Sequence, residues 1–389
     1  MVAFAACSSG LPHREAVDLW AALSEAIEAR RLTFSGAVLV ARDGVSVVES
    51  AAGLADRATG RPNTVETRFN LGSVAKMFTG VAVAQLVQDG RLAFNDTIGK
   101  HLAGFAKEVA DSVTLHHLLT HTSGLGDFMR GGYPEWAKEA TTATELLPLV
   151  TGEALLFAPG ARESYSNSGY LVLGAIVEAA SGQPYFDYVR GHVFEPAGMA
   201  STDWMAPAKA GAGTAVGYPT VAAGGAATGP VPGGPGPASE SGRPRLNLPP
   251  PPGPAQGQGG GAPEPAGNRA LAPGPNPSGG AYSTVGDLLR FARSLLAHRL
   301  LNPAMTEVVL AAKVPMASGR GGVAYGFTDG TIGGLRVVGH GGGAPGIAAS
   351  LDIYPDRGDV VAVLANTDGV LDAVRDEARG AVGRAATGR

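Results

Sequence analysis

Segments typical of β-strands lie only near the two ends of this 389-residue chain, and helix-like segments fill the middle. The expected strands are short, rich in Val, Ile, Leu and Ala, and separated by turn signals such as Asp43-Gly44. They cover residues 36–41, 45–49, 335–340, 348–354 and 360–366. Strands from both ends can share one core if they meet in a single sheet. We therefore expect an α+β fold, an α/β sandwich with an antiparallel sheet of about five strands.

Helical periodicity predicts what covers this sheet. Apolar residues recur every three to four positions near each end of the chain and in several internal segments. The expected helices are 15–31, 73–88, 169–180, 288–296 and 372–385. The first and last of these are expected to flank the sheet. The region from about 98 to 205 is expected to form an inserted, mostly helical subdomain.

One internal stretch differs in composition from the rest. The chain has 58 Gly and 28 Pro residues, and many of them gather in residues 222–277. Such a segment buries too little apolar area to offset its ordering entropy, so we expect a low-complexity surface insertion. The remainder, 14–386, is expected to form one catalytic domain.

The first residues carry a possible targeting signal. Phe4 to Ser9 surround Cys7 and are similar to the end of a bacterial lipoprotein signal, although no basic or long apolar segment precedes them. We expect residues 1–13 to be flexible. The protein is then periplasmic or extracytoplasmic, lipid-anchored at Cys7 if a fuller signal precedes this sequence, and otherwise cytoplasmic.

Charge and apolar runs limit the classes of partner. The formal net charge is −4 and charged residues make up 16%, which argues against a nucleic-acid-binding protein. The apolar runs are too short for a transmembrane segment. A single cysteine excludes an internal disulfide, and His117 and His121 lack the glutamate of a zinc-hydrolase motif. We expect no metal and no cofactor, and the sequence does not predict the oligomeric state.

The segment Ser73-Val74-Ala75-Lys76 opens a predicted helix and has the spacing of a nucleophile and a base. Residues three apart share a helix face, so the Lys76 amine can reach the Ser73 hydroxyl. A lysine among apolar residues can have a lowered pKa and accept the serine proton. Taken alone, the same pattern also fits a helix-capping serine followed by an exposed lysine.

Two further segments contain residues suited to catalysis or to substrate binding. Tyr165 and Asn167 lie two apart in a predicted loop, where both can face one cleft. His340 ends a predicted strand and is followed by Gly341, Gly342 and Gly343, whose backbone N–H groups can approach an oxyanion. Taken alone, each segment is better explained as an ordinary turn or strand end.

The order of these three motifs resembles that of the serine β-lactamase and penicillin-binding-protein superfamily. The resemblance is greatest to the class C β-lactamases, the D-alanyl-D-alanine carboxypeptidases and the family VIII esterases. It extends over about residues 14–205 and 278–386. The supporting stretches are Phe69 to Gly72, Leu92 to Asp96, Leu118 to Leu125, Phe157 to Gly160 and Gly279 to Thr284.

This resemblance implies a role for each motif residue. Ser73 becomes the acylated nucleophile, and Lys76 and Tyr165 share the work of the general base. Asn167 contacts the substrate, as do the third-motif residues His340, Gly341 and Gly342. The backbone N–H groups of Ser73 and Gly343 form the oxyanion hole. A Ser-His-Asp arrangement through His340 stays an alternative, and the chain has no G-x-S-x-G segment.

The third motif departs from the family pattern, because His340-Gly341-Gly342 replaces Lys-Thr-Gly. The lysine and threonine that engage a substrate carboxylate are both missing. We therefore expect an esterase acting on small acyl esters, with any activity on anionic substrates rising as His340 becomes protonated. The alternatives are a β-lactamase or D-alanyl-D-alanine carboxypeptidase, and a non-catalytic sensor that binds penicillin or peptidoglycan. The expected partner is a small ester, amide or β-lactam substrate.

Overall fold

The structure is a computed structural model of the whole chain. It describes residues 13–30, 33–131, 133–206, 209–211, 213–220, 267–268 and 274–387. The possible lipid-attachment residue Cys7 and most of the predicted 222–277 insertion lie outside the described residues. Among the described residues, no helix combines the length and apolarity that a membrane crossing requires.

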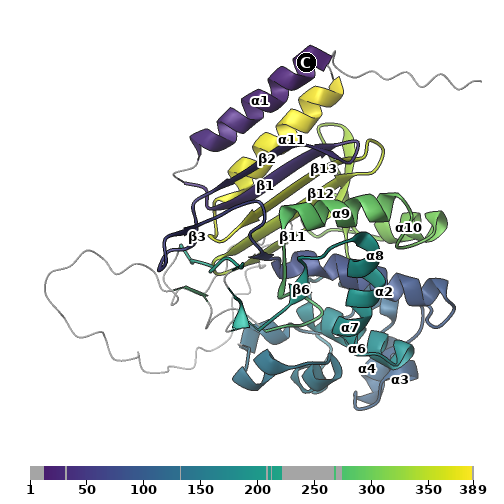
Figure 1. Cartoon of the computed structure of the whole chain (residues 1–389). Helices are drawn as coiled ribbons and strands as arrows, with labels where there is room; N and C mark the ends of the chain where they lie inside the picture. Colours follow the sequence, from purple (N-terminus) through teal and green to yellow (C-terminus); the bar gives the residue numbers. More distant parts are fainter. Residues whose placement is uncertain are drawn as a thin grey trace, which may run out of the picture.

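A central antiparallel sheet joins the two ends of the chain. Its strand order is β2-β1-β13-β12-β11-β10-β9-β8, and Gly36 of β1 pairs with Ala365 of β13. The predicted strands correspond to β1 (Gly36–Arg42), β2 (Val45–Ala52), β11 (Leu335–Ala344), β12 (Ile347–Tyr354) and β13 (Asp359–Ala365). The expected meeting of both chain ends in one sheet is therefore confirmed (Figure 1).

The expected number of about five strands is wrong, because this sheet has eight. The additional strands are β8 (Val314–Pro315), β9 (Gly322–Val323) and β10 (Thr328–Ile332). Two of them have only two residues, and the third contains Asp329 and Gly330. Such segments lack the apolar alternation by which strands are recognised. They extend the sheet one after another: β10 pairs with β11, β9 pairs with β10, and β8 pairs with β9.

Alternate residues of the sheet face two separate cores, as strand geometry requires. On one face, Val38 and Val40 of β1 join a cluster with Leu23 and Ile27 of α1 (His13–Ala29). Val374 and other residues of α11 (Leu371–Thr387) complete this cluster. Helices α1 and α11 thus lie side by side over the sheet (Figure 1).

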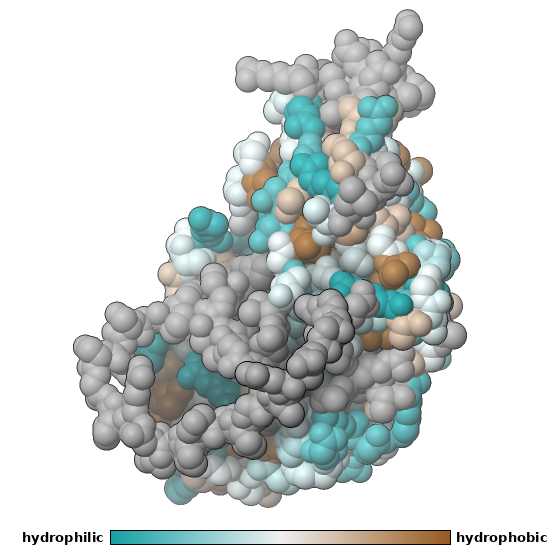
Figure 2. Space-filling model, turned by 90° about the vertical axis from the view of Figure 1, so that its left-hand side faces the viewer, coloured by the Kyte–Doolittle hydropathy of each residue, from teal (hydrophilic) through white to brown (hydrophobic). Residues whose placement is uncertain are grey.

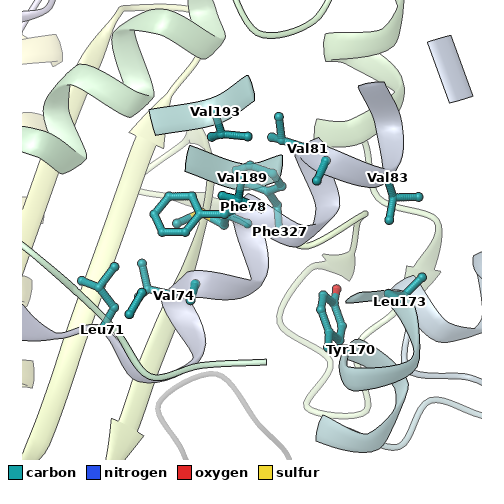
Figure 3. Packing of buried hydrophobic residues seen from close by; sticks show 14 of the residues in the cluster. Leu71, Val74, Phe78, Val81, Val83, Tyr170, Leu173, Val189, Val193 and Phe327 are labelled. Carbon is teal, nitrogen blue, oxygen red and sulfur yellow. The ribbon is translucent and has the colours of Figure 1, made fainter. Parts of the chain in front are cut away.

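The other face carries the larger core and the helical region. It is built around α2 (Lys76–Gln88), which is buried on nearly every side. Phe78 of α2 packs edge-on against Phe194 and Phe291, each with a centroid distance of 5.0 Å. Figure 3 shows α2 and its apolar neighbours from several segments in this core. A helix that is apolar all round is expected in such an interior position.

Several further helices lie along the chain between β2 and β11. Helices α6 (Asn167–Ser181) and α9 (Val285–Leu296) pack in the same core as α2. The shorter helices are α3 (Ile98–His101), α4 (Lys107–Ser112), α5 (Leu115–Leu119), α7 (Tyr185–Val189), α8 (Glu195–Ala197) and α10 (Pro303–Leu310). Two small sheets, β3 (Leu54–Asp56) with β4 (Arg61–Pro62), and β5 (Phe69–Asn70) with β7 (Ala281–Ser283) and β6 (Asp203–Trp204), complete the fold.

The surface carries apolar side chains singly. On the face in Figure 2, the described hydrophobic residues are scattered among hydrophilic ones. The large apolar side chains that are exposed come from different segments: Val45, Leu54, Trp136, Leu156 and Val308. Isolated apolar residues of this kind are ordinary at a protein surface.

The end of the predicted insertion packs on the core. Asn268 donates to the Pro345 carbonyl over 2.7 Å and accepts from the Gly217 N–H over 3.1 Å. The Pro277 carbonyl accepts from the buried Thr79 hydroxyl over 2.6 Å. Residues 274–277 are all buried. These few residues therefore belong to the folded core rather than to a loose surface loop.

This packing defines where the insertion can be shortened. We expect replacement of residues 222–264 by a short Gly/Ser linker to leave the melting temperature and the rate on small esters nearly unchanged. Each twofold change in loop length alters the closure free energy by only about 0.6 kcal/mol. Extension of the deletion through 277 should lower both, because Thr79 loses its carbonyl acceptor. Calorimetry and ester kinetics on the two variants test this, and equal effects would contradict it.

Candidate active site

Ser73 lies at the entry to the central helix. It belongs to a 3₁₀ turn, η1 (Gly72–Ala75), that leads directly into α2. Gly72 has a φ of +48°, a conformation that favours glycine, and its N–H donates to the Asn70 side chain over 2.9 Å. The sequence predicted the helix start at Ser73, and the structure instead forms this tight turn first. The turn leaves Ser73 partly exposed while the residues after it are buried.

The Lys76 side chain is buried, and its amine has three hydrogen-bond partners. Its relative exposure is 0%. Its Nζ lies 3.1 Å from Ser73 Oγ, 2.7 Å from Asn167 Oδ1 and 2.8 Å from the carbonyl oxygen of Ser278. These three acceptors come from η1, from α6 and from the segment that follows the insertion. The interpretation of this segment as a helix cap required an exposed lysine. The structure has a buried lysine instead.

Burial lowers the pKa of Lys76 to about 7, because the ammonium loses its hydration. The negative charge of Asp127 acts in the opposite direction and raises this pKa. The aromatic faces of Tyr165 and Tyr170 lie 4.9 Å and 5.3 Å from Nζ. A lysine with such a pKa exchanges protons readily near neutral pH.

Tyr165 lies between the lysine and two imidazole rings. Its ring centroid is 4.3 Å from that of His121 and 6.3 Å from that of His340. Burial raises the pKa of Tyr165, and the neighbouring Ser73 hydroxyl opposes this rise. Among the described residues, no group makes a hydrogen bond of normal geometry with its hydroxyl. The phenol is therefore protonated at neutral pH.

Asn167 connects the lysine to an acidic residue. It is the first residue of α6, whose N-terminus is capped by the Ser166 side chain. Its Oδ1 accepts from Lys76, and its Nδ2 lies 3.2 Å and 2.9 Å from the two carboxylate oxygens of Asp127. The helix start thus places the amide between a cation and an anion.

The glycines of β11 lie against the backbone of the serine turn. A Cβ at Gly342 would be 2.1 Å from the Leu71 carbonyl oxygen and 2.9 Å from the Ser73 nitrogen. A Cβ at Gly72 would be 3.0 Å from the Gly343 nitrogen. Pairing of β10 with β11 ends at Gly339, so the following residues of β11 have no β10 partner. Only glycine permits this close approach of the two backbone segments.

His340 is close to the site but engaged elsewhere. Its Nδ1 lies 2.5 Å from the Gly341 carbonyl oxygen, while Ser73 is hydrogen-bonded by Lys76. Burial, together with the nearby Lys76 charge, lowers the pKa of His340 to about 4. The imidazole is therefore neutral at neutral pH. This geometry favours the lysine over a Ser-His-Asp arrangement.

The structure brings all three sequence motifs together and adds Asp127 and Ser278, which the sequence did not single out, and His121, which the sequence offered only as a zinc ligand. Asp127, Ser278 and His121 contribute an anion, a carbonyl acceptor and a stacked ring. His121 lies in a stretch already noted, but a backbone carbonyl and a lone aspartate have no sequence signature. His117, the other candidate zinc ligand, closes a capping box with Thr114 instead.

Known proteins provide an independent comparison for this site. The model of the family described as Beta-lactamase matches residues 22–384. The chain belongs to the Beta-lactamase family. The resemblance inferred from the motifs is thereby confirmed at the level of the family.

Two curated relatives match the chain over part of its length. Penicillin-binding protein 4* of Bacillus subtilis is 34% identical over 172 residues, 43% of this chain and 38% of that protein. Esterase EstB of Burkholderia gladioli is 39% identical over 199 residues, 47% of this chain and 50% of that protein. The match thus spans half or less of each of these relatives.

Solved structures share the fold over nearly the whole chain. A penicillin binding protein from Bacillus halodurans superposes with a TM-score of 0.70 at 25% identity, covering 93% of this chain and 98% of that chain. The D-amino acid amidase from Ochrobactrum anthropi SV3 gives a TM-score of 0.73 at 22% identity, covering 96% and 100%. The expected fold class is confirmed by these likenesses, apart from the number of strands.

The glycine contact allows a direct test of the geometry. We expect Gly342→Ala to displace the Leu71–Ser73 backbone, because the new methyl group overlaps the Leu71 carbonyl oxygen. Overpacking of this kind costs about 1–3 kcal/mol of stability. Ester hydrolysis should fall with it. Gly152→Ala is the control, since nothing lies within 4 Å of a Cβ there. Wild-type melting temperature and activity in Gly342→Ala would show that the contact is not needed.

Proposed function

We propose that this protein is a serine hydrolase that forms a covalent acyl-enzyme on Ser73 and acts on small acyl esters. The observation that carries the proposal is the buried Lys76 amine, 3.1 Å from the Ser73 hydroxyl. Its lowered pKa gives it a proton-accepting form at neutral pH. A serine hydroxyl needs such a base to become an effective nucleophile.

The hydrogen bonds of Lys76 support its assignment as the base. A neutral amine has two N–H donors and one lone pair. Asn167 Oδ1 and the Ser278 carbonyl oxygen are acceptors only and take the two donors. The lone pair is then directed to the Ser73 hydroxyl, which can donate its proton along the 3.1 Å contact. The neutral lysine therefore satisfies every partner around it.

Tyr165 fits a different role. Its pKa is raised by burial, so a phenolate is disfavoured near neutral pH. A neutral phenol beside Ser73 donates a hydrogen bond and relays a proton to a departing oxygen. The sequence left the base open between Lys76 and Tyr165. The opposite directions of the two pKa shifts favour Lys76 for acylation.

Acylation then follows with balanced proton transfers. Ser73 Oγ attacks the ester carbonyl carbon while its proton passes to Lys76 Nζ. We assign the oxyanion hole to the backbone N–H groups of Ser73 and Gly343, and the close contact of their two segments supports this assignment. Collapse breaks the bond to the leaving alkoxide, which takes a proton from the Lys76 ammonium through Tyr165. The acyl group remains on Ser73.

Deacylation repeats these steps with water as the nucleophile. Lys76, neutral again, accepts a proton from water as the water attacks the acyl carbonyl. The same N–H groups hold the second oxyanion. Ser73 leaves as its oxygen regains a proton from the lysine. Asn167 orients the lysine in both half-reactions.

The substrate preference follows from the third motif. At neutral pH the neutral His340 and the side-chain-free Gly341 offer no cation and no hydroxyl to a substrate carboxylate. Neutral esters need no such contact. The rise of activity towards anionic substrates at lower pH, expected from the sequence, is revised. His340 gains its proton only near pH 4, where Lys76 is already protonated and inactive as a base.

Nucleophile and base variants test the mechanism. We expect Ser73→Ala to abolish ester turnover and the acyl-enzyme seen by intact mass spectrometry. Lys76→Ala should reduce kcat by roughly 10³-fold or more, because nucleophile and base act as a unit. Tyr165→Phe should retain a measurable acylation rate. Substantial turnover by a folded Ser73→Ala protein would remove the basis of the proposal.

A substrate panel tests the preference. We expect kcat/KM for p-nitrophenyl butyrate to exceed that for a cephalosporin by at least roughly tenfold, since a charge-assisted hydrogen bond is missing. The double variant His340→Lys with Gly341→Thr should reduce this ratio. If the wild-type protein prefers a cephalosporin, the result favours a β-lactamase. If it prefers a D-alanyl-D-alanine peptide, the result favours a carboxypeptidase. A persistent acyl adduct favours a non-catalytic sensor.

A further inference from the structure

Asp127 lies next to the lysine site without touching the lysine itself. It directly precedes the 3₁₀ turn η2 (Phe128–Gly131) and is absent from the S-x-x-K, Y-x-N and third motifs. Both of its carboxylate oxygens are within hydrogen-bond distance of Asn167 Nδ2, at 3.2 Å and 2.9 Å. A carboxylate only accepts hydrogen bonds. It therefore requires the NH₂ group of Asn167 to face it and turns the amide oxygen towards Lys76.

The position of Asp127 does not depend on the lysine. Its Oδ1 accepts from the Met129 N–H over 3.0 Å. The neighbouring Phe128 N–H donates to Ser168 Oγ over 3.0 Å, and Ser168 donates to Glu153 over 2.8 Å. On the other side, Ser166 Oγ donates to the Gly126 carbonyl over 2.6 Å. The loop that carries Asp127 is thus tied to the first turn of α6, which carries Asn167.

We propose that Asp127 is a positioning residue for Lys76: it holds the Asn167 amide in one orientation and places a carboxylate near the lysine. This inference rests on the proposed function, since it concerns the base that acylates Ser73. The hydrogen bonds between Asp127 and Lys76 run through the amide, over the contacts Asp127–Asn167 and Asn167–Lys76.

The charge has a consequence for the pH range of the reaction. The groups around Lys76 are the rings of Tyr165 and Tyr170, the imidazoles of His121 and His340, and the Asp127 carboxylate. Burial lowers the pKa of Lys76, and Asp127 is the charged group that raises it. Without this charge the pKa of the lysine falls further. Neutral lysine, the active form, then persists to lower pH.

A lower pKa of Lys76 also reduces the maximal rate of acylation. A base of lower pKa accepts a proton less readily, so the best catalytic pKa lies near the working pH. The charge of Asp127 thus limits the fall in the pKa of the buried Lys76, so that the amine remains an effective base. It also prevents the Asn167 amide from rotating, which would direct an NH₂ group at the lysine amine and remove its acceptor.

The test is the pH dependence of Ser73 acylation in the full chain. The burst of p-nitrophenol from p-nitrophenyl acetate is followed by stopped flow, with intact mass confirming the acyl-enzyme. The acid limb is the low-pH side of the pH–rate profile, where the acylation rate rises as Lys76 loses its proton. For Asp127→Asn we expect this limb to move to lower pH by roughly half to one pH unit. The maximal acylation rate should fall. Asp127→Ser removes the same charge without adding a competing NH₂ group, and it should give the same shift.

Two comparison variants separate charge from packing. Asp127→Glu keeps the charge, so its acid limb should stay at the wild-type pH even where its rate falls. Asp376→Asn, on α11 across the sheet, removes an exposed carboxylate and should leave both limb and rate unchanged. A merely structural Asp127 would lower rates and melting temperature without moving the limb.

The outcomes distinguish this inference from the proposed function. Acid limbs of Asp127→Asn and Asp127→Ser that coincide with the wild type would overturn the role of the charge, while Ser73 acylation itself stands. A limb that moves to higher pH would also overturn it, because the sign would be wrong. Absence of any acyl-Ser73 in the wild-type protein would overturn the proposed function and this inference together.

Discussion

The buried amine of Lys76 is the group on which the rest of the structure depends. An ammonium removed from water costs several kcal/mol unless other groups replace its hydration. Here three oxygen acceptors do so, from Ser73, Asn167 and Ser278. The apolar helix α2 and the aromatic rings around it exclude water from the same place. The larger hydrophobic core thus surrounds one polar side chain, that of Lys76.

The sheet contributes to the site through the backbone of β11 and through the His340 side chain. Strand β11 lacks a β10 partner beyond Gly339, and its glycines contact the turn that carries the nucleophile. Since β11 pairs with β12 and, through β13, with β1, its position is set by both ends of the chain. In the proposed mechanism, the helical region provides Lys76 and Asn167, and the sheet provides the Gly343 N–H as one of the two oxyanion donors. The reaction is placed where these two halves meet.

Much of this architecture could be predicted from the sequence, and the exceptions have physical reasons. The central strands were predicted because β-branched and small apolar residues mark them, whereas β8 to β10 are short, polar or glycine-containing. Ser73, Lys76, Tyr165 and Asn167 were found by motif. Asp127 and Ser278 were not, because they act through long-range hydrogen bonds without a local pattern. The proposed division of roles between Lys76 and Tyr165 rests on burial, which spacing alone does not reveal.

The wide separation of the lysine's partners along the chain has a kinetic consequence. Asn167 lies 91 residues from Lys76, and Ser278 lies 202 residues away. Contacts between such distant residues form late in folding, because long loops must close first. A partly folded chain can hold Ser73 and Lys76 close together, where η1 leads into α2, and still leave the amine hydrated, with an ordinary proton affinity. Enzymatic activity during refolding should therefore return with the slowest structural phase, and newly made chains would have little reactivity before folding is complete.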